Sequence, residues 1–238
     1  MSANRHVLPD AQTAADQCAA RIIELLEDVL ATRELATLAV SGGHTPRLMF
    51  RKMAALPFNW KRVHLFWVDE RCVPPKDPAS NYKMANEELI APAHFPERNV
   101  HRILGEIAPR EAAERYVAEI RQFFGLAAGD MPHFDVVQCG MGPDAHTASL
   151  FPGEPLLDDR AGIAAATYAA QFQQWRVTLL PGPLLAARSL LYLVSGQDKA
   201  ESLRAVFHEP SDPKKYPAQV IGRNAQWFLD EPAAGLLE

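Results

Sequence analysis

Apolar runs of strand length alternate with helical patterns along most of this chain, and the alternation limits the folds open to it. Leu35–Val40 and Val63–Val68 are short runs dominated by aliphatic and aromatic residues, as expected for buried strands. Further strands are predicted at residues 134–139, 176–180 and 189–195. Strands that alternate with helices form a mostly parallel sheet with helices on both faces. The sequence therefore predicts an α/β fold of three layers (α/β/α) with a Rossmann-like central sheet.

Helical patterns occupy the stretches between these strands. Residues 10–33 place apolar side chains at helical spacing, and Asp10 stands where the N-cap of such a helix is expected. Further helices are predicted to start at Pro46 and at Ser80 or Asn81, and to cover residues 112–124 and 198–207. Since 238 residues are enough for one large core, we expect residues 1–238 to form a single domain.

Composition and charge exclude several classes of protein. The formal net charge is −5 and the chain has no basic stripe, so we expect no nucleic-acid partner. Cys18, Cys72 and Cys139 are widely spaced and form no CxxC pair, which favours free thiols over a disulfide framework or a zinc site. No segment has the length of a membrane span or the apolar core of a signal peptide. We therefore predict a cytoplasmic protein that binds no membrane.

The segment after the predicted strand at residues 134–139 carries the strongest chemical signal. Two glycines open it and allow a sharp turn close to a ligand. Asp144 and His146 follow two residues apart, so both side chains can project toward the same side. A carboxylate beside an imidazole suits general-base catalysis, with His146 as the base. For Asp144 the alternative is an N-cap of a helix over residues 145–150.

A second candidate segment, residues 41–46, joins a predicted strand to a helix. Its two glycines and two hydroxyl side chains leave N–H and O–H donors free, and a phosphate group binds such donors at a helix start. The residues expected to contact phosphate are Ser41, Gly42, Gly43 and Thr45. The segment lacks the glycine and lysine pattern of a P-loop, and a tight turn that binds nothing is the alternative.

Three cationic side chains also stand at or near predicted strand ends. Arg71 follows the second predicted strand, Arg176 opens a later one, and Lys199 stands where the last strand gives way to a helix. Taken singly, each could be a surface charge, and Arg71 could pair with its own acidic neighbours. Together they supply the positive charge that a dianionic phosphate needs in an acidic protein. The segments at residues 41–46, 69–71 and 140–149 all follow predicted strands directly. Since ligands of open parallel sheets bind beyond the carboxyl ends of the strands, we expect a single site.

These segments resemble the motifs of the 6-phosphogluconolactonase family in order and spacing. The matching segments are Ser41-Gly42-Gly43-x-Thr45-Pro46, Asp69-Glu70-Arg71-x-Val73-Pro74 followed by Ser80-Asn81, and Gly140-x-Gly142-Pro143-Asp144-x-His146-Thr147-Ala148-Ser149-Leu150-Phe151-Pro152. Arg176-x-Thr178 and Gly196-x-x-Lys199 follow, and the resemblance extends from residue 7 to residue 229. The family usually carries glycine where this chain has Ala145. If that position needs a positive φ, alanine costs roughly 1–2 kcal/mol there.

The resemblance implies hydrolysis of 6-phospho-D-glucono-1,5-lactone to 6-phosphogluconate in the oxidative pentose phosphate pathway, with no cofactor and no metal. It also implies the sheet architecture shared with glucosamine-6-phosphate deaminases and ribose-5-phosphate isomerases. In this reaction His146 would activate the attacking water and Asp144 would orient its imidazole. Backbone N–H groups of a glycine turn, or Arg71, would stabilise the oxyanion. Residues 41–45 and the two remaining cations would hold the phosphate.

Two other functions use the same fold. An amino-sugar-phosphate deaminase or isomerase would bind the same phosphate, but such deaminases tend to carry tyrosine where this chain has Arg71. A non-catalytic sugar-phosphate sensor would lack the base or carry a DNA-binding domain, whereas His146 is present and the chain leaves no room for such a domain. We therefore expect an enzyme whose partner is a small sugar-phosphate lactone, as a monomer or a small homo-oligomer.

Overall fold

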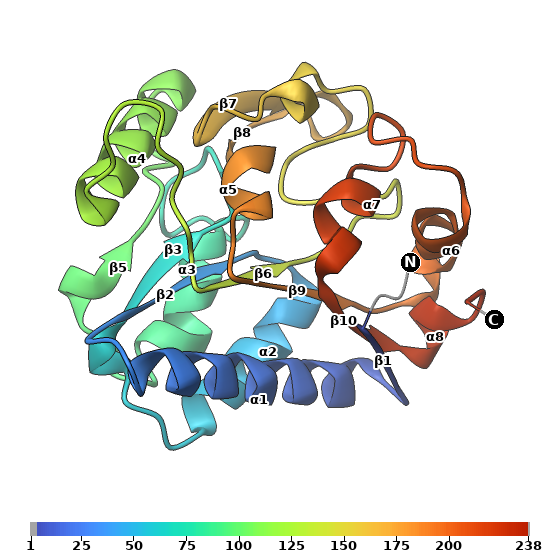
Figure 1. Cartoon of the computed structure of the whole chain (residues 1–238), viewed down its shortest axis with the longest axis horizontal. Coiled ribbons are helices and arrows are strands. Elements are labelled where there is room, and N and C mark those ends of the chain that lie inside the picture. Colours follow the sequence, from blue (N-terminus) through green and yellow to red (C-terminus); the bar gives the residue numbers. More distant parts are fainter. Residues whose placement is uncertain (1–3, 238) are drawn as a thin grey trace.

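A seven-stranded parallel sheet forms the centre of the computed structural model, which describes residues 4–237 (Figure 1). In spatial order its strands are β1 (Asn4–Leu8), β10 (Gln226–Asp230), β9 (Ser189–Val194), β6 (Val136–Cys139), β2 (Ala36–Val40), β3 (Val63–Trp67) and β5 (Val100–His101). Every pair of neighbours is parallel. The predicted α/β fold with a mostly parallel central sheet is confirmed.

Helices cover both faces of this sheet. On one face, below the sheet in Figure 1, α1 (Ala11–Leu30) and α2 (His44–Ala55) pack against each other. Across the sheet in the same view lie α4 (Pro109–Phe124), α5 (Pro181–Leu185) and α7 (Pro217–Ile221). The remaining helices are α3 (Asn81–Ala85), continued by a π-helical turn (Asn86–Ile90), α6 (Ala200–His208) and α8 (Glu231–Ala234). No helix within residues 4–237 is long and apolar enough to cross a bilayer.

The starts of α1 and α2 show how local sequence sets the helix boundaries. α1 begins at Ala11 because the Asp10 carboxylate accepts a hydrogen bond from the Thr13 backbone N–H at 2.7 Å, which confirms the predicted N-cap. α2 begins at His44, two residues before the predicted start at Pro46. Proline is accepted there because none of the first backbone N–H groups of a helix has a partner within the helix.

A three-stranded antiparallel sheet within the same described residues lies beside the main one. Its order is β4 (Asp69–Arg71), β8 (Gln174–Leu179) and β7 (Ala164–Ala169). The sequence predicted the strand at 176–180 as part of one mostly parallel sheet, and this was wrong. Val68 joins the two sheets, since its N–H donates to Val40 O (2.9 Å) and its carbonyl accepts from Leu179 N (2.8 Å). The chain therefore passes from β3 into β4 without a loop.

The order in which strands are added to the sheet changes direction between β2 and β6, so these two neighbours form a topological switch point. From β2 the chain adds β3 and β5 on one side, and after crossing back it adds β6, β9 and β10 on the other. Such a switch point opens a crevice beyond the carboxyl ends of the two strands. Ser41 N still donates to Gln138 O at 3.1 Å, so β2 and β6 remain paired up to the edge of this crevice.

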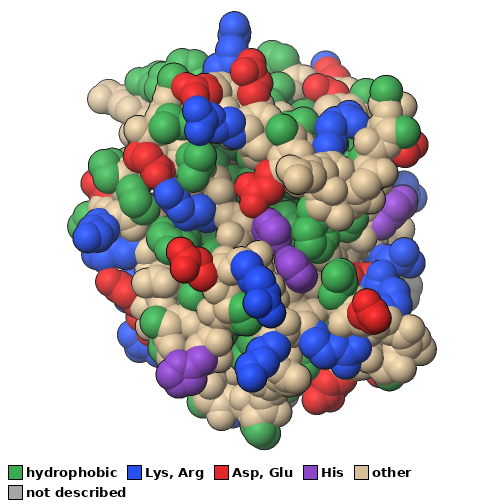
Figure 2. Space-filling model, turned by 90° about the vertical axis from the view of Figure 1, so that its left-hand side faces the viewer, with side chains coloured by type: hydrophobic (Ala, Val, Ile, Leu, Met, Phe, Trp, Pro, Cys, Tyr) green, Lys and Arg blue, Asp and Glu red, His purple; other side chains and the backbone are tan. Residues whose placement is uncertain are grey.

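Charges of both signs are mixed on the surface. On the face shown in Figure 2, Lys and Arg side chains are interspersed with Asp and Glu side chains and form no stripe of one sign. Neighbouring opposite charges pair, as in Arg51–Glu88 and Arg102–Glu106, both at 2.6 Å. A surface of this kind gives no extended positive potential on that face.

Candidate active site

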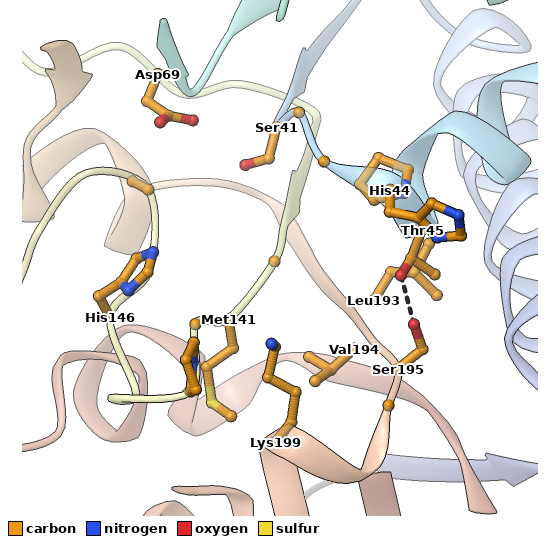
Figure 3. A pocket seen from close by; sticks show the side chains of 18 of the residues that line it. Ser41, His44, Thr45, Asp69, Met141, His146, Leu193, Val194, Ser195 and Lys199 are labelled. Atoms are coloured by element: carbon orange, nitrogen blue, oxygen red, sulfur yellow. Dashed lines mark hydrogen bonds between the residues drawn. The ribbon is translucent and has the colours of Figure 1, made fainter. Parts of the chain in front are cut away.

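A pocket of about 630 Å³ opens at the crevice between β2 and β6. Many of its lining residues lie at or beyond the carboxyl ends of β2, β6, β9 and β10, and others come from β4 and β8 of the small sheet. Figure 3 shows His146 on one side of this pocket, Thr45 and Ser195 on the other, and Lys199 between them. Segments that are far apart in the sequence therefore meet at one sheet edge.

The pocket brings together all but one of the residues that the sequence assigned to the site. Its lining includes Ser41, Gly42, Gly43, Thr45, Arg71, His146, Arg176 and Lys199. Asp144 does not line the pocket but is hydrogen-bonded to the ring of His146. The assignment of these residues to a function remains a prediction, but their convergence is a property of the fold.

Asp144 holds the His146 imidazole. The ring Nδ1 lies 2.5 Å from Asp144 Oδ1, and the same oxygen accepts the His146 backbone N–H at 3.1 Å. Phe151 packs against the ring, with centroids 4.6 Å apart. Partial burial alone would raise the pKa of Asp144, but the hydrogen bond and charge of His146 lower it below its ordinary value. With an ionised partner at Nδ1, Nε2 is the nitrogen free to take a proton.

The chain around His146 forms a strained turn, and the helix considered for residues 145–150 is absent from this described segment. Ala145 N donates to Gly142 O at 3.0 Å and Gly142 N donates to His146 O at 2.9 Å. Ala145 has a φ of +63°, so alanine at this position is strained. Glycine is needed at 142 because a Cβ there would lie 2.0 Å from His146 Cε1. Asp144 is therefore not a helix N-cap, and its carboxylate is hydrogen-bonded to the imidazole of His146.

The small sheet supplies a polar wall of the pocket. Arg71 on β4 and Arg176 on β8 are register partners, as are Asp69 and Thr178. Alternate residues of a strand share a face, so these four side chains lie on one face. Asp69 Oδ2 accepts the Ser149 hydroxyl hydrogen bond at 2.7 Å, and Ser149 N donates to Thr178 Oγ1 at 3.1 Å. These bonds tie the loop of the candidate base to the strands of the arginines.

Arg176 is a buried cation with unused donors. Its Nη1 lies 3.8 Å from Asp69 Oδ2, and its Nε has no hydrogen-bond partner among residues 4–237. Burial lowers the pKa of Arg176, and Asp69 acts in the opposite direction. The guanidinium lies 4.9 Å from the centroid of the Phe172 ring. A buried, unpaired N–H group at a pocket wall gains most from an anionic ligand.

Hydroxyl groups of the segment between β2 and α2 also line the pocket, together with Ser195. Ser41 Oγ is buried and unpartnered within the described part of the chain, and Thr45 Oγ1 is hydrogen-bonded to Ser195 Oγ. Gly42 is required because a Cβ there would lie 1.8 Å from Asn81 Oδ1. These hydroxyls stand at the start of α2, where free N–H groups and the helix dipole favour an anion.

Lys199 adds a positive charge near that helix start. Its ammonium group pairs with Asp198 and extends into the pocket in Figure 3. Its side chain is 19% exposed, so a ligand can reach the ammonium while most of the stem stays packed. The helix start and Lys199 together can hold a phosphate group.

Sequence reasoning did not assign several lining residues to the site. They include Asp69, Asn81, Met141, Ser195 and Asp230. Asp69 and Asn81 belong to the motif segments, and this position in a motif could have indicated that they lie in the site. Ser195 directly follows a predicted strand, and the carboxyl ends of parallel strands share one edge. Asp230 had no signal because the strand that ends there was not predicted.

The part of the chain that the structure describes contains no cluster of metal-binding side chains. No three His, Cys, Asp or Glu side chains within residues 4–237 lie close enough together to hold a metal ion. Cys18, Cys72 and Cys139 are free thiols.

Residues 9–229 match the family model of glucosamine-6-phosphate isomerases/6-phosphogluconolactonase. The chain belongs to this family. It is 34% identical to the 6-phosphogluconolactonase of Synechocystis sp., with 95% of each chain covered. It is also 34% identical to the 6-phosphogluconolactonase of Haemophilus influenzae, with 96% of this chain and 97% of the relative covered. The solved 6-phosphogluconolactonase structure from Trypanosoma brucei shares the fold, with a TM-score of 0.90 at 24% identity over 100% of this chain and 99% of that one.

Proposed function

We propose that this chain hydrolyses 6-phospho-D-glucono-1,5-lactone to 6-phospho-D-gluconate, with His146 as the general base that activates water. The activity is that of a 6-phosphogluconolactonase, a hydrolase of carbohydrate metabolism that acts in the pentose phosphate pathway. Relatives of that name at 34% identity over nearly the whole length support it. The observation that carries the mechanism is the Asp144–His146 pair beside a pocket lined by three cationic side chains.

The chemical step needs one proton acceptor that later returns the proton. His146 Nε2 takes a proton from water as the water oxygen bonds to the lactone carbonyl carbon, and the carbonyl electron pair moves to oxygen. When this tetrahedral oxyanion collapses, the bond to the ring oxygen breaks and the imidazolium donates its proton to that oxygen. The ionised Asp144 at Nδ1 stabilises the imidazolium between these two events and fixes the ring orientation.

The oxyanion needs donors that are already in place. Arg71 is one candidate, because its Nη1 is fixed by the Ala79 carbonyl at 2.6 Å while its buried Nε is unpartnered among the residues described. Backbone N–H groups at residues 140 and 141 of the glycine turn are the other, since the N–H of Gly142 already donates to His146 O at 2.9 Å.

The substrate phosphate would occupy the side of the pocket away from His146. Its oxygens would accept hydrogen bonds from the segment at residues 41–45, namely from Ser41, Gly42, Gly43 and Thr45. Its charge would be balanced by Lys199 at that end and by Arg176, which faces the pocket from the small sheet. His146 and Thr45 lie on opposite sides of the pocket (Figure 3). One sugar-phosphate molecule can therefore place its carbonyl at the base and its phosphate at the helix start.

The proposal also includes the cofactor requirement, the domain organisation and the cellular location of the enzyme. Hydrolysis of a lactone transfers no electrons and so needs no redox cofactor, and in the proposed mechanism His146 activates the water and polar donors stabilise the oxyanion. We therefore propose that it proceeds without a cofactor or metal. The pairing of β1 with β10 joins the two ends of the chain in one sheet, which supports a single domain over residues 1–238. The three free thiols are consistent with a cytoplasmic location.

An assay of two substrates tests the reaction class, because the family includes isomerases as well as lactonases. The purified chain should accelerate loss of freshly generated 6-phosphogluconolactone above its spontaneous hydrolysis, with the same rate in EDTA. It should release no ammonia from glucosamine 6-phosphate. Ammonia release without lactone hydrolysis would assign the chain to the amino-sugar-phosphate deaminases instead.

A further inference from the structure

The loop that carries His146 adopts a backbone conformation that needs support from outside. Ala145 and Ala148 have φ values of +63° and +53°, which L-residues rarely adopt. Such a conformation persists only where surrounding contacts hold it. His146 lies between these two alanines, so the contacts that hold the loop also determine where the imidazole lies.

Two buried hydroxyl hydrogen bonds hold this loop at its centre. Tyr192 on β9 donates its phenolic hydrogen to Thr147 Oγ1 at 2.9 Å, and Thr147 donates its own to Gly140 O at 2.9 Å. Neither Tyr192 nor Thr147 is exposed to solvent. Thr147 directly follows His146, and Gly140 begins the same loop. The two bonds therefore fix the ends of the turn relative to each other and to the main sheet.

Tyr192 is itself rigidly placed. Its ring stacks on Trp227 of β10, with centroids 4.0 Å apart and an interplanar angle of 17°. Trp227 Nε1 donates to Gly222 O at 3.1 Å, and a Cβ at residue 222 would lie 2.3 Å from the Trp227 ring. Complete burial raises the pKa of Tyr192 well above its ordinary value, so the hydroxyl keeps the proton that it donates.

We propose that Tyr192 is a positioning residue for lactone hydrolysis, which acts on His146 through Thr147. This inference rests on the proposed role of His146 as the base. Tyr192 is not one of the residues that line the pocket in the described chain, so it acts by keeping the strained turn in one conformation. When the Tyr192 hydroxyl is removed, Thr147 Oγ1 loses the hydrogen bond that connects it to β9. The strained turn can then relax to another conformation. A displacement of about 1 Å at a catalytic group can lower a rate about 10²-fold.

Tyr192→Phe tests the inference because it removes one oxygen and keeps the stacked ring. We expect kcat for 6-phosphogluconolactone to fall about ten-fold, as for the loss of one well-placed hydrogen bond. KM should stay within about two-fold of the parent value, because the phosphate contacts are untouched. Thr147→Val should lower kcat at least as much, and Thr147→Ser, which keeps the hydroxyl, should retain most of it. Combining Tyr192→Phe with Thr147→Val should lower kcat no further than Thr147→Val alone, since Thr147→Val already removes both bonds.

Tyr116→Phe is the matched control. Tyr116 is as buried as Tyr192, but its hydroxyl donates to Trp67 O at 2.7 Å, away from the loop. The same hydroxyl also accepts the Trp67 backbone N–H at 2.9 Å, so Tyr116→Phe should lower the Tm at least as much as Tyr192→Phe and leave kcat unchanged. A parental kcat in both Tyr192→Phe and Thr147→Val, or an equal loss in Tyr116→Phe, would overturn the inference. If His146→Asn kept the parental kcat in the same assay, the proposed base itself would be wrong, which is a separate failure.

Discussion

Ala145 shows what a single side chain costs in the loop of the candidate base. Its φ of +63° is a conformation that glycine adopts freely and alanine does not. We expect Ala145→Gly to stabilise the folded state by about 1 kcal/mol, which for a chain of this length raises Tm by about 2–4 °C. Thermal unfolding followed by circular dichroism measures this shift.

Ala15→Gly is the control for that measurement, because Ala15 is equally buried but lies inside α1. Glycine in a helix interior costs about 1 kcal/mol, so its Tm should fall. If Ala145→Gly lowered Tm to the same extent, the turn would not be strained at this residue.

The proposed phosphate contacts can also be tested by single substitutions. Lys199→Ala and Arg176→Gln each remove a positive charge from the pocket, and glutamine keeps a donor for the buried Asp69. Each should raise KM for the phosphorylated lactone by roughly 10- to 100-fold, the value of a charged hydrogen bond of about 1.5–3 kcal/mol. Because the phosphate is remote from the carbonyl, these contacts contribute mainly to binding. Steady-state kinetics over a range of lactone concentrations measure both constants.

Lys214→Ala serves as the charge-matched control, since Lys214 is 67% exposed and pairs with Asp158 outside the pocket. It should keep the parental KM. Unphosphorylated gluconolactone should respond to none of the three variants. Parental KM values in both Lys199→Ala and Arg176→Gln would remove these residues from the phosphate site.

At the scale of elements, two histidine rings and a glutamate form a hydrogen-bonded chain that connects β3, β5 and α4. His64 Nδ1 lies 2.8 Å from His101 Nε2, and His101 Nδ1 lies 2.7 Å from Glu119 on α4. Phe123 packs against both rings. Burial lowers the pKa of His64 to about 4, and the nearby His101 and Arg98 act in the same direction. The folded protein therefore keeps His64 neutral at pH values where an exposed histidine is protonated.

This pKa shift predicts how stability changes with pH. In the unfolded chain His64 titrates near pH 6.5, so between about pH 6.5 and 4 the unfolded state binds a proton that the folded state does not. The free energy of unfolding should therefore fall as the pH falls through this window. His64→Gln cannot titrate and should show a smaller decrease in urea unfolding experiments at pH 7, 5.5 and 4.5. Parallel curves for parent and variant would contradict the assignment.

The elements also show which parts of the fold a single sequence can predict. β2, β6 and β9 were predicted because each is a buried apolar run bounded by turn residues. β4 and β5 have only three and two residues, too few for any periodicity. β1 and β7 were missed because their apolar patterns are weak or broken by polar residues. β10 was missed because its apolar run, residues 227–229, is too short to show a period. The start of α2 was placed late because proline was taken as the first helical residue rather than the third.

At the scale of the whole molecule, the parallel sheet explains why the site could be predicted before its geometry was known. The glycine-rich segments and His146 follow strands directly, and the carboxyl ends of those strands meet at one edge. The role of Asp69 could not be read from sequence, because it depends on β4 turning away into the small sheet beside β8. The contact of Tyr192 with Thr147 joins residues 45 positions apart, and no local pattern reports such a contact.

The measurement that tests the account most directly is kcat for 6-phosphogluconolactone in His146→Asn. Asparagine is close in size and keeps an N–H donor for Asp144, so the turn can remain in place while the base is lost. We expect kcat to fall by about 10²–10⁴-fold, the usual contribution of a general base, with KM close to the parental value. A kcat within about two-fold of the parent, at an unchanged Tm, would contradict His146 as the group that activates water.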